Sequence, residues 1–332
     1  MLVFGALLAA GLACGSFPSP AEPTTVGSVI PGTRALTDDQ AYYESPAWSP
    51  NGRYLGAFRG YRITADIIHA DSFETGPVLI DLDSGERRFI GSPPTVKPED
   101  AFGPVLWQPG EGGVTFYYFD RAGGQEGPAL VTYFPDTAEF SSLAFCQCGR
   151  VAFNAEGNQI LVVGPSEEAF ELSWFDLETG LTSNELSLDR AEPRQHRYFY
   201  LALSPDNGSL LLDDLDGTVF KYEMDSGQAP VPFLSPAATP AWSPDGSKIV
   251  YASLPANGDL YSGQLMIANA DGSSPEPLFP EPQPAGMLAP AWSPDGTQIA
   301  FLYGTRHSNR ILIAEVPERL RPLGVGATPA GP

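Results

Sequence analysis

The chain has 332 residues, a formal net charge of −22 and only three lysines, so its surface repels phosphate backbones and anionic lipid headgroups. We therefore expect no nucleic-acid partner, and no membrane contact except through an N-terminal lipid anchor. Glycine (35 residues) and proline (34 residues) are abundant and long helical periodicities are missing, which favours an all-β protein with many turns.

The first segment, residues 1–14, has the composition of an export signal. Met1–Ala13 is apolar without a break, too short to span a bilayer but long enough for the hydrophobic region of a secretory signal. The next residue, Cys14 in GLACGS, resembles the lipidation site of bacterial lipoproteins. Leu12 stands one place nearer the cysteine than is usual and no Lys or Arg precedes the run, so an ordinary signal peptide stays an alternative. Either way we expect an exported protein, periplasmic or at the cell surface.

The segments at the two ends of the chain are typical of unfolded linkers. Residues 15–33 are rich in Pro, Ser and Thr, cannot bury enough apolar surface to fold, and predict a flexible tether. Residues 324–332 predict a featureless tail. The folded part of the chain is therefore expected at residues 34–323.

A six-residue stretch, AWSPDG, occurs twice within that part, at Ala241–Gly246 and Ala291–Gly296. Pro presets φ for a type I turn, Asp tolerates the next position, and Gly supplies the positive φ that leaves the turn. An apolar stretch follows each copy, so each predicts a tight hairpin. Relaxed copies follow the same pattern, at Ser45–Phe58, Val105–Phe119, Val151–Gly164 and Leu201–Asp214.

A second shared part follows downstream: an apolar strand, an Asp/Gly turn and a short edge strand. It is found at Val78–Phe89, Leu172–Leu186, Val219–Leu234 and Leu265–Phe279. Four strands per unit of roughly 40–50 residues is typical of a propeller blade. We predict a six-bladed β-propeller of four-stranded antiparallel blades, with the Trp of AWSPDG packed between neighbouring blades. Either Arg34–Asp38 or Arg319–Leu323 could close the sixth blade.

The repeated AWSPDG, with its following strand and a D-x-x-[ST]-G turn, resembles the TolB-like propeller repeat, which also occurs in prolyl-oligopeptidase-type peptidases. The likeness covers nearly all of the folded part. TolB itself carries an N-terminal α/β domain, for which there is no room before Trp48, so the resemblance is to the propeller alone. It implies a six-bladed ring with a binding role in the periplasm or at the cell surface, and it names no ligand.

Catalytic and metal-binding patterns are weak in this sequence. A serine peptidase of the related kind needs a G-x-S-x-G elbow, which is absent, and the three histidines form no short-range pair. Turns such as Asp81–Gly85 and Asp213–Gly217 lack the oxygen spacing of a calcium loop. Cys146 and Cys148 could share one face of a strand, but we interpret them as incidental. We expect no catalytic residue, metal or cofactor.

The most informative constellation depends on propeller topology. The AWSPDG turns lie on one face of the ring, so the connections between second and third strands and between blades lie on the other. The sequence places all three histidines and several arginines in those connections. The candidates for a binding face are Arg62, His69, Arg194, His196, Arg197, Tyr198, Arg306, His307 and Arg310. Together they would form a locally basic, aromatic-rich channel mouth on an acidic protein, which suits an anionic or aromatic partner. The alternative is that these are ordinary solvated loop residues, since loops host polar residues in any protein.

Two classes of function follow from these observations. The first is a monomeric, non-enzymatic binding or scaffold module of the bacterial cell envelope, which recognises a protein or a small anionic or aromatic ligand. The second is a hydrolase or lyase that acts on saccharides or peptides in the propeller channel. Two carboxylates about 5–10 Å apart at the channel mouth would favour the second class.

Overall fold

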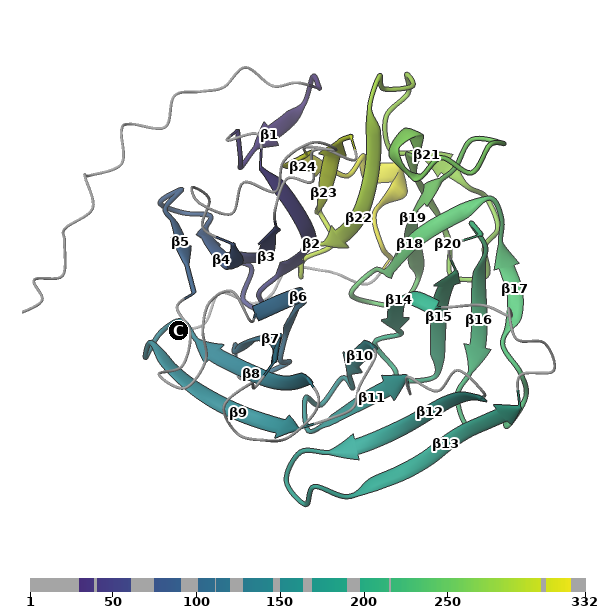
Figure 1. The fold of residues 1–332 in the computed structure, drawn as a ribbon. Helices are drawn as coiled ribbons and strands as arrows, with labels where there is room; N and C mark the ends of the chain where they lie inside the picture. The colour runs from purple at the N-terminus through teal and green to yellow at the C-terminus, as the bar shows by residue number, and fades with distance from the viewer. Residues whose placement is uncertain are drawn as a thin grey trace, which may run out of the picture.

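The computed structural model describes residues 30–38, 41–60, 75–90, 101–110, 112–119, 128–145, 150–163, 169–189, 198–214, 216–305 and 309–323. Within them, six four-stranded antiparallel sheets form a closed ring (Figure 1). The predicted fold class is therefore confirmed. No helix in the described ranges is long and apolar enough to cross a membrane.

Each of the first five sheets runs outward from the ring centre in chain order. Blade 1 has β2 (Tyr42–Trp48), β3 (Tyr54–Gly60), β4 (Gly76–Asp81) and β5 (Arg87–Phe89). Blade 2 has β6 (Ala101–Trp107), β7 (Val114–Phe119), β8 (Pro128–Phe134) and β9 (Glu139–Phe145). Blade 3 has β10 (Arg150–Phe153), β11 (Gln159–Val163), β12 (Ala169–Asp176) and β13 (Thr182–Asp189). Blade 4 has β14 (Tyr198–Leu203), β15 (Ser209–Asp214), β16 (Val219–Glu223) and β17 (Val231–Leu234).

The last two blades complete the ring. Blade 5 has β18 (Ala237–Trp242), β19 (Lys248–Ser253), β20 (Gln264–Asn269) and β21 (Glu276–Pro277), with the short 3₁₀ helix η2 (Leu260–Ser262) between its middle strands. Blade 6 has β22 (Gly286–Trp292), β23 (Gln298–Gly304) and β24 (Asn309–Glu315), followed by η3 (Glu318–Leu320). Its fourth strand comes from the other end of the chain, β1 (Thr33–Ala35).

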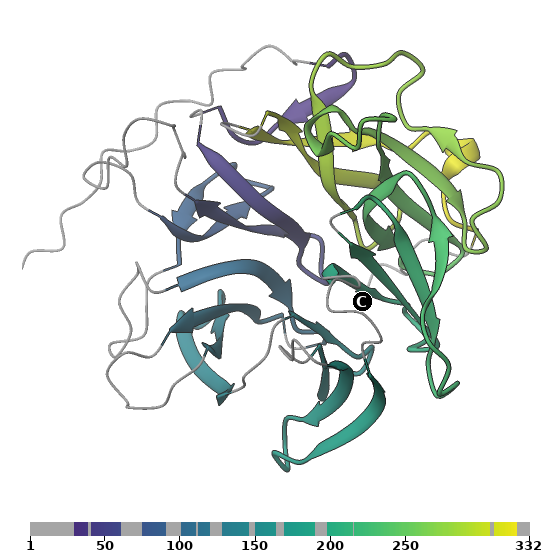
Figure 2. The ribbon, with the colours of Figure 1, turned by 45° about the vertical axis from the view of Figure 1, so that its right-hand side comes forward.

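The N-terminal segment thus closes the ring, which answers the question that the sequence left open. β1 pairs antiparallel with β24, and Arg34 lies opposite Ile313. Figure 2 shows this purple N-terminal strand beside the yellow-green strands of the C-terminal blade. The competing segment, Arg319–Leu323, instead begins within η3. An apolar cluster joins blades 6 and 1, including the buried side chains of Tyr43, Leu302 and Ile311.

The repeated turn owes its shape to one hydroxyl and one carboxylate. In the fifth blade, Ser243 Oγ donates to Asp245 (2.8 Å) and accepts the backbone N–H of Lys248 (2.9 Å). Gly246 leaves the turn at φ 72°, a conformation that Gly adopts without steric cost. The same pair of contacts recurs at Ser293 in blade 6. The turn chemistry expected from AWSPDG is therefore confirmed.

The fourth blade offers a pH test of this turn. Hydrogen bonds from the Ser204 hydroxyl and the Gly208 N–H hold the pKa of Asp206 below its ordinary value of 3.8. The folded state therefore binds the proton more weakly than the unfolded state, so the carboxylate contributes stability above pH 3.8 and loses it as the pH falls through the lowered pKa. We expect Asp206→Asn to cost about 0.5–1 kcal/mol at pH 7, a modest value because the group is exposed.

Urea unfolding of the wild type and Asp206→Asn at a series of pH values measures this contribution, because the effect of the large net charge is nearly common to both chains. The gap between the two should stay constant down to about pH 4 and vanish below it. A gap that widens in acid would contradict the assignment.

Candidate functional site

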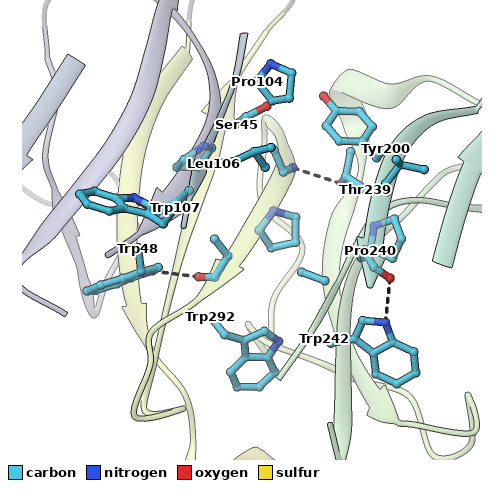
Figure 3. Close-up of a pocket in the computed structure, with 18 of the residues that line it drawn as sticks. Ser45, Trp48, Pro104, Leu106, Trp107, Tyr200, Thr239, Pro240, Trp242 and Trp292 are labelled. Carbon is cyan, nitrogen blue, oxygen red and sulfur yellow. Dashed lines mark hydrogen bonds between the residues drawn. The ribbon is translucent and has the colours of Figure 1, made fainter. Parts of the chain in front are cut away.

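The innermost strands of the blades surround a cavity of about 460 Å³ at the ring centre (Figure 3). All six blades contribute to its wall, and proline, tryptophan, alanine and leucine dominate it. Hydroxyl groups come from Ser45, Tyr200, Thr239 and Ser243. Among the described residues of the wall, none is charged. A cavity of this size and character is typical of a small-ligand or peptide site.

The tryptophans of the wall join neighbouring blades. The indole N–H of Trp48 donates to the carbonyl of Ala291 (3.0 Å) and that of Trp242 to Ala202 (3.0 Å). The N–H of Trp107 donates in the same way to Ala47 (2.8 Å). The expected position of the repeat Trp between blades is therefore confirmed, and Figure 3 shows these rings standing at the cavity wall. Their fluorescence should report what enters the cavity.

A proline precedes the Ala-Trp pair in three innermost strands. Pro46, Pro240 and Pro290 each lie at a β-bulge, where the strand register shifts against its neighbour. The residues before them adopt positive φ angles of 48° at Ser45, 49° at Thr239 and 47° at Ala289. Proline is tolerated here because the innermost strand has an unpaired edge towards the channel. Pro104 lies in the corresponding irregular stretch of β6.

A buried carboxylate binds the backbone at the bulges of β14 and β18. Asp213, on β15, is 2% exposed and accepts the backbone N–H groups of Tyr200 (2.9 Å) and Thr239 (2.7 Å). The Thr239 hydroxyl in turn accepts the N–H of Ala289 from blade 6 (3.1 Å). Blades 4, 5 and 6 are therefore linked by one chain of hydrogen bonds directly behind the cavity wall.

Tyrosines gather where β2 begins, at the end of the channel opposite the AWSPDG turns. Burial raises the pKa of Tyr42 far above its ordinary value of 10.0, and its hydrogen bond with Tyr261 adds to the shift, as do the charges of Tyr261, Glu44 and Tyr200. Tyr42 belongs to blade 1, whereas Tyr261 lies in η2 of blade 5. The hydrogen bond therefore joins two blades that are not neighbours in the ring.

Most residues of the predicted binding face cannot be compared with this cavity. Arg62, His69, Arg194, His196, Arg197, Arg306 and His307 lie outside the described residues, as do Cys14, Cys146 and Cys148. The backbone of Tyr198 begins β14 and pairs with Asp214, but its side chain is not described. Arg310 lies on β24, the third strand from the centre, and is not in the cavity wall. The binding face thus stays a prediction.

The described strand ends follow the predicted topology: β3 and β23 end, and β14 begins, at the face opposite the AWSPDG turns. In the described ranges, no group of three or more His, Cys, Asp or Glu side chains could hold a metal ion.

The cavity wall was not predicted, although the sequence held a signal for it. The tripeptide Pro-Ala-Trp occurs at 46–48, 240–242 and 290–292, directly before the turn that defines the repeat. A proline repeated inside an expected strand indicates an unpaired edge or a bulge. The role of Asp213 had no such signal, because its partners lie on two other strands.

Solved structures resemble this fold at low sequence identity. TolB from Acinetobacter baumannii aligns with a TM-score of 0.56 and 17% identity over 78% of this chain, which spans 59% of that protein's length. A protein assigned as TolB from Agrobacterium tumefaciens aligns with 0.58 and 16%, over 86% of this chain and 94% of that one. An oligogalacturonate lyase in complex with manganese aligns with 0.53 and 12%, over 87% and 94%.

The expected likeness to the TolB propeller is therefore confirmed at the level of the fold. No family model and no curated protein sequence matches the chain. Because a lyase shares the architecture, the fold alone does not choose between binding and catalysis.

Proposed function

We propose that this chain is a non-enzymatic binding module of the bacterial cell envelope and that the central cavity is its ligand site. The observation that supports this proposal is the wall of the cavity, in which prolines and tryptophans from several blades meet without a charged side chain among the described residues. Such a wall offers shape and apolar contact, which serve binding. Acid–base catalysis depends on titratable groups positioned against the reacting atoms.

The place of action belongs to the same proposal. The apolar run Met1–Ala13 and the following Cys14 support export, with the lipid on Cys14 as the anchor. An exported propeller on a flexible tether can present its channel to an envelope protein or to a small ligand. The predicted loop face, with Arg194, His196 and Arg197, would then flank the cavity mouth.

Cross-linked pull-down from envelope extract, analysed by mass spectrometry, tests the proposal. The wild type is compared with Tyr200→Ala, which alters the cavity wall, and with a triple variant in which Arg194, His196 and Arg197 become alanine. Phe233→Ala, on the outermost strand of blade 4, is the matched control. We expect a partner to be retained by the control and reduced about tenfold or more by Tyr200→Ala. Equal capture by all four folded chains would refute a role for the cavity.

Two further arms of the same experiment test anchoring and catalysis. Fractionation should move the protein out of the detergent phase when Cys14 is replaced by serine. The lyase alternative is favoured by the structural likeness to the oligogalacturonate lyase. Incubation with oligogalacturonate, with and without Mn²⁺, should give no unsaturated product. Turnover above that of the heated protein would replace the binding proposal with the lyase.

A further inference from the structure

The prolines of the channel wall change which hydrogen-bonding groups a ligand meets. An innermost strand has a neighbour on one side only, so part of its backbone faces the channel unpaired. Proline has no N–H, and Pro46, Pro240 and Pro290 occupy the same place in three innermost strands, two residues before the wall tryptophan. We call this position the proline level, and three blades contribute no backbone N–H there.

The neighbouring backbone donors are already used. The N–H groups of Tyr200 and Thr239 point to the carboxylate of Asp213, and the N–H of Ala289 points to the Thr239 hydroxyl. All three residues line the cavity. These three backbone N–H groups are therefore closed to a ligand, and the indole N–H of Trp292, which has no partner, is buried. Backbone carbonyl oxygens, by contrast, accept hydrogen bonds wherever a ligand reaches them.

The electrostatics of the wall act in the same direction. The carboxylate of Asp213 is buried and lies one hydrogen bond behind two lining residues. The whole chain carries a net charge of −22, so cations are also drawn towards it.

We propose that the channel selects ligands that carry an ammonium or guanidinium group on an apolar body, and that it rejects anions. This inference rests on the proposed function, because it names the ligand class of the same cavity. The ligand proposed for the channel is therefore opposite in charge to the anionic partner expected from the arginine-bearing loops. The charged donor would meet the proline level while the apolar body packs against the surrounding side chains.

Three probes of matched shape test the proposal by isothermal titration calorimetry: phenethylammonium, phenethyl alcohol and 3-phenylpropionate. We expect the ammonium to bind the wild type at least about tenfold more tightly than the alcohol, and the carboxylate to bind most weakly. The Pro240→Ala/Pro290→Ala double variant restores two backbone donors without changing the net charge. It should narrow the ratio of ammonium to carboxylate affinity by about threefold or more. Pro294→Ala, in the β22–β23 turn outside the wall, should leave that ratio unchanged.

Each outcome separates this inference from the proposed function. If the alcohol binds as tightly as the ammonium, or the carboxylate binds best, the charge selection is wrong while the cavity remains a ligand site. If the double variant and Pro294→Ala both keep the wild-type ratio, the preference comes from the net charge and the proline level plays no part. If none of the probes binds, both the inference and the cavity as a small-ligand site are overturned.

Discussion

Replacement of Asp213 by alanine is expected to lower the free energy of unfolding by about 3–5 kcal/mol, because it leaves two backbone N–H groups without their acceptor. Those groups belong to Tyr200 and Thr239, in adjacent blades, and the carboxylate between them is 2% exposed. Guanidinium unfolding followed by tryptophan fluorescence measures the loss. Asp213→Asn keeps one carbonyl acceptor and should lose about half as much.

The matched control is Asp216→Ala, an exposed acid in the following turn. We expect it to change the unfolding free energy by no more than about 0.5 kcal/mol. A loss below about 1 kcal/mol for Asp213→Ala would show that the bulges of β14 and β18 hold without the carboxylate.

The fold could be predicted because each blade repeats the same local chemistry. The Ser, Asp and Gly of the AWSPDG turn act on backbone groups within five residues of one another, as at Ser243 and Lys248. A pattern of this kind is visible in sequence whatever surrounds it. The blade count follows from repetition, since a four-stranded sheet buries its faces only against further copies.

The candidate site could not be predicted in the same way because its contacts join residues from different blades. Asp213 contacts Thr239, and Thr239 contacts Ala289, each across a blade boundary. Asp213 lies in the sequence DDLDG, which has the composition of a simple turn. The search for histidine and arginine clusters followed chemical reactivity, whereas the cavity wall is built from prolines and tryptophans. Only the recurrence of Pro-Ala-Trp could have indicated it.

Ring closure provides the second large effect. Removal of residues 1–37 is expected to lower the thermal midpoint by about 8 °C, from the loss of roughly 5 kcal/mol in a chain of this size. The removed residues include Ile30, which is 1% exposed in the core of blades 5 and 6, and the whole of β1. They also include Thr37, whose hydroxyl accepts the buried N–H of Ile311 (2.9 Å).

A chain that lacks only residues 1–28 is the matched comparison, since the two truncations differ by the closing segment alone. Ile30→Ala in the full chain should account for about 2–4 kcal/mol of the loss. Scanning calorimetry measures the thermal midpoints of the two truncated chains and of Ile30→Ala. Equal midpoints for the two truncations would mean that blade 6 is stable with three strands, held to blade 1 by Asn309, which bonds both N and O of Tyr43.

Loss of the N-terminal strand that closes the ring should also weaken ligand binding in the cavity. The cavity wall includes residues of β2 in blade 1 and of β22 in blade 6, so it is closed only if these two strands lie together. At their contact the indole N–H of Trp48 donates to the carbonyl of Ala291. Below its thermal midpoint, the chain without residues 1–37 should therefore bind phenethylammonium at least about tenfold more weakly than the chain without residues 1–28. Unchanged affinity in the shorter chain would show that the apposition of blades 1 and 6 does not depend on the N-terminal strand, and that this strand contributes stability alone.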